Sequence, residues 1–250
     1  MISFFRKLRQ KLLEQNQIGR YLKYALGEIL LVVIGILIAL QVNNWNESRK
    51  QQNTRHVLNE SLLMELAKDK ELLLYDIDEL SSRISILDDI KSRINAPQAS
   101  MDTVDQIIRH EFDFSFVKVS KLNRSTFSIL SSTGQLAYFS DKEADNIQRN
   151  YQRLLDIEEF EDSQLNFFKE QLSRYLEKIP VTDATYLQNY TVFIPGKIKD
   201  DLWNGVDMAE ARLMFGGLSS LQIHVFVTFR NYSNELLELN AQLEKQLKGQ

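Results

Sequence analysis

The 250-residue sequence holds 30 Lys and Arg against 34 Asp and Glu, together with 9 Gly, 3 Pro and no Cys. The absence of Cys excludes disulfides, zinc–thiolate sites and cysteine nucleophiles from this sequence. The small share of Gly and Pro favours long helices over a many-turned β fold, and the length accommodates one sizeable domain and an anchor.

The first 23 residues are basic. Six Lys and Arg against one acid give them a charge of +5, so the remainder carries −9 of the net −4. This pattern predicts contact with an anionic lipid surface, and the acidic remainder argues against nucleic-acid binding. The opening residues fit either an amphipathic helix in the headgroup layer or a simple basic flank. The predicted membrane-surface residues are Arg6, Lys7, Arg9, Lys11, Arg20, Lys23 and Trp45.

Residues 24–46 predict a transmembrane helix. Between Leu26 and Val42 only Glu28 and Gln41 are polar, and a helix of that length spans about 25 Å, close to the thickness of the bilayer hydrocarbon core. A signal peptide and a buried core helix are the alternatives. The segment lacks a small-x-small cleavage site and is apolar on every face, so an uncleaved membrane helix fits best.

The flanking charges predict the orientation. Six Lys and Arg precede the apolar segment, whereas Arg49, Lys50 and Arg55 follow it. The positive-inside rule then places the N-terminus in the cytoplasm. The predicted division is a basic juxtamembrane segment at 1–23, a membrane helix at 24–46 and an extramembrane helical domain at 47–250.

Glu28 stands at the head of the apolar segment and admits three interpretations. It is an interfacial acid that pairs with Lys23 or Arg20, the polar head of a helix-packing face, or part of a proton or ion pathway. The packing face contains a small-xxx-small pair that allows close helix approach, and this favours a homo-oligomer or a partner membrane protein. Its residues are Glu28, Leu31, Gly35, Ala39 and Val42.

Heptad spacing replaces the all-apolar pattern further along the chain. It predicts an amphipathic, coiled-coil-like helix from Thr54 to Ile94, ended by Asn95-Ala96-Pro97. Lys70 fills one position of its apolar stripe. The stripe consists of Leu63, Leu66, Leu73, Ile77, Leu80, Ile84, Leu87 and Ile94.

Residues 102–111 indicate a short helix, and the alternating Phe112, Phe114 and Phe116 indicate an extended segment. This segment pairs with residues 190–194 in a small two-stranded element, or both are extended linkers on a helical bundle. A short helix follows and is closed by Gly134, a residue type that suits the left-handed position after a helix end.

Ser140 and Glu143 form a predicted capping box that opens a helix ended by Pro180. Its apolar stripe is Ile147, Tyr151, Leu154, Leu165, Phe168, Leu172, Tyr175 and Ile179. Glu158 and Glu161 occupy the stripe between residues 154 and 165. The favoured interpretation is a register slip that turns Ile157 and Phe160 inward, because unpaired buried carboxylates are costly. Otherwise the two acids face the core and need cationic partners or a ligand.

A short helix at 208–215 is expected to end at Gly216-Gly217, and a last helix to run over 219–248. The fold class is therefore all-α: an N-terminal membrane helix followed by a long-helix bundle. His56, His110 and His224 have no ligand partner at helical spacing, and His224 is expected as a packed core residue. No catalytic, cofactor-binding or metal-binding residues are predicted.

The segment GEILLVVIGILIALQVNNWNE (Gly27–Glu47), after the basic FFRKLRQKLL, resembles a family of uncharacterised single-pass membrane proteins from Bacteroidetes-type bacteria. Members tend to show a Leu-x-x-Ser-Gly-x-Leu pattern, and here Thr133 separates Ser132 from Gly134. The resemblance implies a Gram-negative inner-membrane protein, which agrees with the orientation predicted from the flanking charges, namely a periplasmic helical domain. It supplies no activity or site residues.

Two functions remain open. The first is a non-catalytic, membrane-anchored scaffold, accessory subunit or sensor, with the lipid bilayer and a second copy or another membrane protein as partners and no cofactor. The second is a small-molecule-binding or hydrolytic domain that uses scattered acids such as Glu158 and Glu161.

Overall fold

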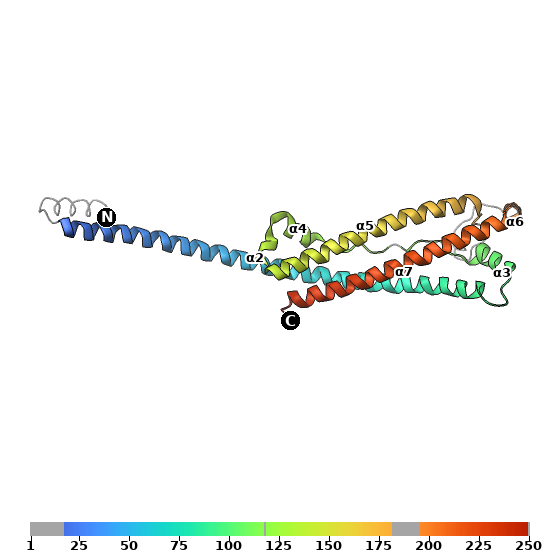
Figure 1. Cartoon of the computed structure of the whole chain (residues 1–250), viewed down its shortest axis with the longest axis horizontal. Coiled ribbons are helices and arrows are strands. Elements are labelled where there is room, and N and C mark those ends of the chain that lie inside the picture. Colours follow the sequence, from blue (N-terminus) through green and yellow to red (C-terminus); the bar gives the residue numbers. More distant parts are fainter. Residues whose placement is uncertain (1–17, 118, 182–195, 250) are drawn as a thin grey trace. The chain divides into compact units, whose positions relative to one another are not determined.

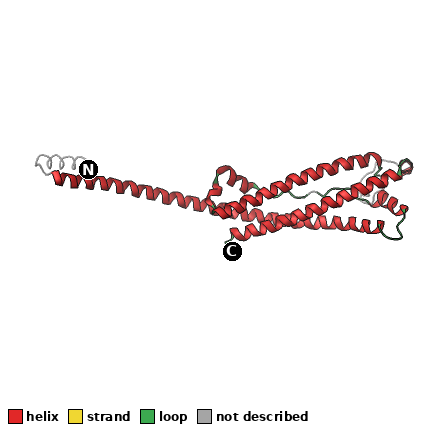
Figure 2. Cartoon of the chain, in the orientation of Figure 1, coloured by secondary structure: helices red, strands yellow, loops and turns green. Residues whose placement is uncertain are grey.

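The computed structural model describes residues 18–117, 119–181 and 196–249. Its elements are all helical, and the described residues contain no strand (Figure 2). The chain divides into two compact units, residues 1–57 and residues 58–250. The all-α prediction is therefore confirmed for the described residues. The helices are α2 (Ile18–Ile94), α3 (Met101–Gln106), the π-helix η1 (Ile107–Glu111), α4 (Ser125–Thr133), the 3-10 helix η2 (Gln135–Tyr138), α5 (Asp141–Lys178), α6 (Gly196–Asn204) and α7 (Met208–Leu247).

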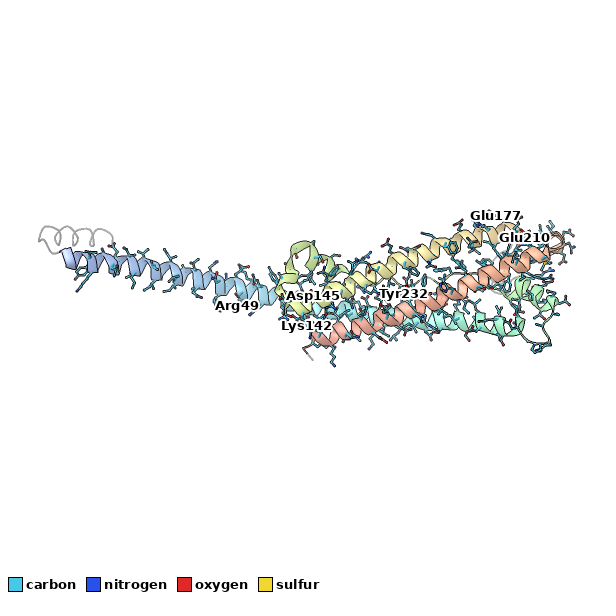
Figure 3. All side chains as sticks on the ribbon, in the orientation of Figure 1. Arg49, Lys142, Asp145, Glu177, Glu210 and Tyr232 are labelled. Carbon is cyan, nitrogen blue, oxygen red and sulfur yellow. The ribbon has the colours of Figure 1, made fainter. Side chains whose placement is uncertain are left out.

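The second unit is a bundle in which α5 and α7 lie side by side (Figure 1). The end of α5 and the start of α7 are at the same end of this unit, where Glu177 and Glu210 are labelled in Figure 3. Lys178 lies 3.6 Å from Glu210 there. One core cluster combines residues 80–90 of α2 with the N-terminal half of α7, and the other combines residues 58–73 with its C-terminal half.

Two predicted helix signals are confirmed. The Ser140 hydroxyl accepts from the Glu143 N–H, and the Glu143 carboxylate accepts from the Ser140 N–H at 2.9 Å, so the capping box opens α5. Gly134 follows α4 with φ 70°, in the left-handed region that an L side chain rarely adopts.

The predicted break at Gly216-Gly217 is wrong, because α7 runs through both glycines. Neither glycine has positive φ, whereas Gly134 does. Buried Ala211, Phe215 and Leu218 keep one face of α7 in the core across this point. That burial outweighs the roughly 1 kcal/mol that each interior glycine costs relative to alanine.

The predicted stripe on α2 is right at five positions, which are buried: Leu66, Leu73, Leu80, Ile84 and Leu87. It is wrong by one position at Leu63, Lys70 and Ile77. Lys70 is exposed, and Leu63 and Ile77 are half-buried. The residues one position earlier, Leu62, Asp69 and Asp76, are buried instead. The same 3-4 spacing therefore runs through two aspartates.

The expected two-stranded element is not present in the described residues. Residues 112–117 form no strand, and residues 190–194 lie outside the described part of the chain. Phe112 and Val117 are buried in the core, and Phe116 contacts Phe168 and Phe229 with ring centroids 5.7 and 5.9 Å apart. The alternative interpretation, an extended linker on the bundle, describes this segment.

Candidate functional site

In the first unit, the described helix contains one stretch that is long and apolar enough to cross a membrane, and none of that stretch is buried. Leu31 is 72% exposed and Val42 is 58% exposed. A Cβ at Gly35 would meet nothing within 4 Å. The chain itself therefore does not cover this surface in the described structure.

The predicted packing residues share one helix face. At 100° per residue, Glu28, Leu31, Gly35, Ala39 and Val42 fall within about 80° of each other around α2. Lys23 and Trp45 are exposed at the two ends of the apolar stretch, and Arg20 also belongs to α2. The remaining predicted membrane-surface residues, Arg6, Lys7, Arg9 and Lys11, lie outside the described residues.

In the second unit, an extended segment is fastened to α2 by carboxylates. We call residues 112–117 and 119–124 the strap. Asp76 accepts hydrogen bonds from the Ser120 N–H at 2.8 Å and the Ser120 hydroxyl at 2.9 Å. Asp69 accepts from the Asn123 N–H at 2.9 Å and the Asn123 side-chain amide at 2.6 Å. These acids supply acceptors to backbone N–H groups that have no helical partner.

Side-chain contacts with α2 continue at both ends of the strap. Glu65 accepts from the N–H of Thr126 at 3.0 Å, one turn before Asp69 on α2. Arg83 pairs with Asp113 at the other end. Residue numbers rise along the strap as they fall along α2, so the two segments run antiparallel.

Asp69 and Asp76 are each 2% exposed. Burial raises the pKa of both carboxyls, and the hydrogen bonds from Asn123 and Ser120 oppose that rise. The sequence interpretation missed both residues because it assigned Lys70 and Ile77, each one position further along the helix, to the stripe. The 3-4 spacing of Leu62, Leu66 and Leu73 could have revealed them, since it passes through both aspartates.

A small cavity of about 60 Å³ lies between the strap, α5 and α7. Glu158 accepts from Arg124 at 2.9 Å through Oε2, while its Oε1 is buried without a hydrogen-bond partner among the described residues. Burial, the largest cause, raises the pKa of Glu161 to about 8, nearby acids add to the rise and Lys121 opposes it. The lining residues are Phe116, Val119, Ser120, Lys121, Glu158, Glu161, Asp162, Leu165 and Phe229.

The predicted register slip on α5 is right for Ile157, which is 1% exposed, and wrong for Phe160, which is 38% exposed. Phe160 packs edge-on against Tyr232 at the surface, with ring centroids 5.6 Å apart. Glu158 and Glu161 turn inward, which was the alternative interpretation. Their cationic neighbours are Arg124 and Lys121.

A larger groove of about 480 Å³ follows α5 and α7. Arg153 pairs with Glu235 across it at 2.6 Å, and buried Asn150 donates to Asn240 at 3.1 Å. These polar groups therefore bind each other.

The expectation that His224 is a core residue is wrong, because its side chain is exposed on α7. His56 is exposed and His110 is half-buried. Within the described ranges, no group of three or more His, Asp and Glu side chains is placed to hold a metal ion.

The comparisons with known proteins give one match. The family of unknown function DUF6090 matches residues 28–182, which is more than half of the chain. No curated protein and no solved structure matches the chain. The match begins at Glu28 and includes the apolar stretch, the aspartates of α2, the strap and α5. The chain belongs to the DUF6090 family.

Proposed function

We propose that the chain is a non-catalytic helical domain anchored in a bacterial inner membrane, where it acts as a scaffold, accessory subunit or sensor. The observation that carries the proposal is the uncovered apolar stretch of the first unit, in a chain whose second unit has its own core. Leaving one Leu, Ile or Val side chain in water forfeits about 1.5–3 kcal/mol relative to burial. Lipid removes that cost for the whole stretch.

The expected orientation has the N-terminus in the cytoplasm and the helical domain in the periplasm. The basic residues before the apolar stretch outnumber those after it, and this favours that direction. A signal sequence is disfavoured because the stretch lacks a cleavage site.

Cysteine labelling tests the orientation, since the chain has no Cys of its own. Ala241→Cys places a thiol at an exposed position of α7. A membrane-impermeant reagent should label it in cells whose outer membrane is permeabilised. Gln10→Cys is the control and should react only after the inner membrane is disrupted. The opposite labelling pattern would place the domain in the cytoplasm.

The first proposed partner is a second copy of the same membrane helix, joined through the face at Gly35 and Ala39. Because Gly35 leaves room for another backbone, Gly35→Leu should reduce association in a membrane two-hybrid assay at least fivefold. Gly19→Leu is the matched control, since Gly19 is equally uncovered and lies about 160° from Gly35 around α2. Equal signals from both variants would contradict helix pairing through Gly35, and loss of both would indicate a general insertion defect.

A second candidate function is small-molecule binding or hydrolysis at Glu158 and Glu161. The observation in its favour is the buried Oε1 of Glu158 beside the cavity, which has no hydrogen-bond partner among the described residues. A volume of about 60 Å³ holds only one or two water molecules, so a larger ligand requires the strap to move. Thermal unfolding of the full chain in detergent, with and without millimolar Ca²⁺ or Mg²⁺, tests whether the bound ligand is a divalent cation. A rise in Tm that Glu158→Gln abolishes would support it, and an unchanged Tm would count against it.

A further inference from the structure

The strap depends on side chains from other elements for its hydrogen bonds. Its backbone makes no strand ladder in the described structure. Ser120 and Asn123 donate to α2, while Gln222 of α7 donates to the carbonyls of Asp113 and Ser115 at 2.9 and 3.1 Å. Residues 119–121, beside the cavity, have no fully buried side chain. This part of the strap can therefore separate from α5 without unwinding a helix.

Glu161 faces the strap from α5, across the small cavity. Lys121 faces it from the strap, Asp76 faces it from α2, and Glu158 and Asp162 come from its own helix. The lining residue from α7 is Phe229, which carries no charge.

Among the described residues around Glu161, acidic side chains outnumber basic ones. Arg124 binds Glu158 at 2.9 Å, and Lys121 lies 3.8 Å from Asp162. Each of the two cations is thus beside a different acid. With Asp76 and Glu161 included, four acids face two cations among the described residues of this cluster. Ionisation of Glu161 therefore adds a negative charge where Lys121 already lies beside Asp162.

We propose that the strap is a pH-controlled latch, closed while Glu161 is protonated and loosened from α5 when Glu161 ionises. When the strap moves away, water enters the cavity and solvates the new carboxylate. The latch does not depend on the membrane location, so its failure would leave the proposed anchor untouched.

The direction of the pH effect follows from the linkage between proton binding to Glu161 and closure of the strap. The pKa of Glu161 is raised from 4.5 to about 8 in the closed bundle, so the closed form binds this proton more tightly than the open form. The stabilisation is full below the ordinary glutamate pKa and is lost as the pH rises toward 8. Asp69 and Asp76 also have raised pKa values and act in the same direction.

Hydrogen exchange on the full chain in detergent, measured by mass spectrometry at pH 7 and pH 9, tests the latch. After correction for the pH dependence of intrinsic exchange, protection of the strap amides should fall about tenfold between the two pH values. Peptides from the middle of α7 should keep their protection. Glu161→Gln should hold the strap protected at both pH values.

Glu159→Gln is the matched control, because Glu159 is an exposed neighbour on α5. It should keep the wild-type fall in protection. If Glu161→Gln loses its helical circular dichroism, Glu161→Leu is used in the same comparison, since it is also uncharged. Equal strap protection at pH 7 and pH 9 in the wild type, or an undiminished fall in the uncharged variant, would overturn the proposal.

Discussion

The two units use the same apolar residue types in opposite ways. Leu37, in the first unit, is 55% exposed, whereas Leu80, in the second, is fully buried. The first unit arranges its apolar side chains around the whole helix, and the second places them on one face with polar residues elsewhere. The difference is that the all-round apolar surface of the first unit is left uncovered by the described residues, while the one-sided surface of the second unit is covered within the fold.

Matched leucine substitutions are expected to show the largest difference between the two units. Leu80→Ala should lower the unfolding free energy by about 3 kcal/mol, because it leaves a cavity in the core. Leu37→Ala should change it by less than about 0.5 kcal/mol. Urea unfolding of the full chain in detergent measures both, with Trp203 as the fluorescent probe in a Trp45→Phe background, since Trp203 is buried and Trp45 is 66% exposed.

A similar loss from both leucine substitutions would contradict the distinction. It would mean that the apolar stretch contributes to the fold of the bundle.

Asp69 and Asp76 are polar groups placed on the buried face of α2. Asp69→Ala should cost about 2 kcal/mol, because it leaves the Asn123 N–H and side-chain amide without their acceptor. Asp78→Ala is the control, since Asp78 is exposed on the same helix. The same urea titration measures both variants. Equal small effects would show that the strap does not depend on its carboxylate contact.

The smallest effect is expected at the exposed Arg153–Glu235 pair, whose side chains are 39% and 40% exposed. Hydrogen bonding to Arg153 lowers the pKa of Glu235. The pair therefore stabilises the fold above the ordinary glutamate pKa of 4.5 and loses that contribution as the pH falls through the lowered value. At pH 7, Arg153→Ala should cost at most about 0.5 kcal/mol.

Unfolding at pH 7 and pH 3, each with and without 1 M NaCl, checks this pair. The difference between Arg153→Ala and the wild type should shrink at pH 3 and in salt. Lys142→Ala is an exposed control near the start of α5 (Figure 3). A cost above about 2 kcal/mol that salt does not change would show that packing of Arg153 over the Tyr232 ring, 5.5 Å from its centroid, dominates.

The sequence predicts those features that depend on local chemistry. The capping box at Ser140, the left-handed Gly134 and the end of α2 near Asn95 require only neighbouring residues, and the structure contains all three. The long apolar stretch is equally local. These signals are sufficient for the fold class and for the bounds of several helices.

Features that depend on tertiary contacts were not predictable in this way. The spacing on α2 can place Asp69 and Asp76 in the core, but it does not reveal their partners Asn123 and Ser120, which are more than 40 residues distant. The continuation of α7 through Gly216 depends on burial of its neighbours. The inward position of Glu161 depends on the strap that passes over it. In the latter two cases a distant segment overrides the local pattern.

Carbonate extraction tests directly whether the apolar stretch of the first unit lies in lipid. Membranes that contain the full chain are washed at alkaline pH, which strips peripheral proteins and leaves spanning ones. The wild-type chain should stay in the membrane pellet, and a chain that lacks residues 24–46 should move to the supernatant. Release of the wild-type chain into the supernatant would show that the apolar stretch does not span the membrane.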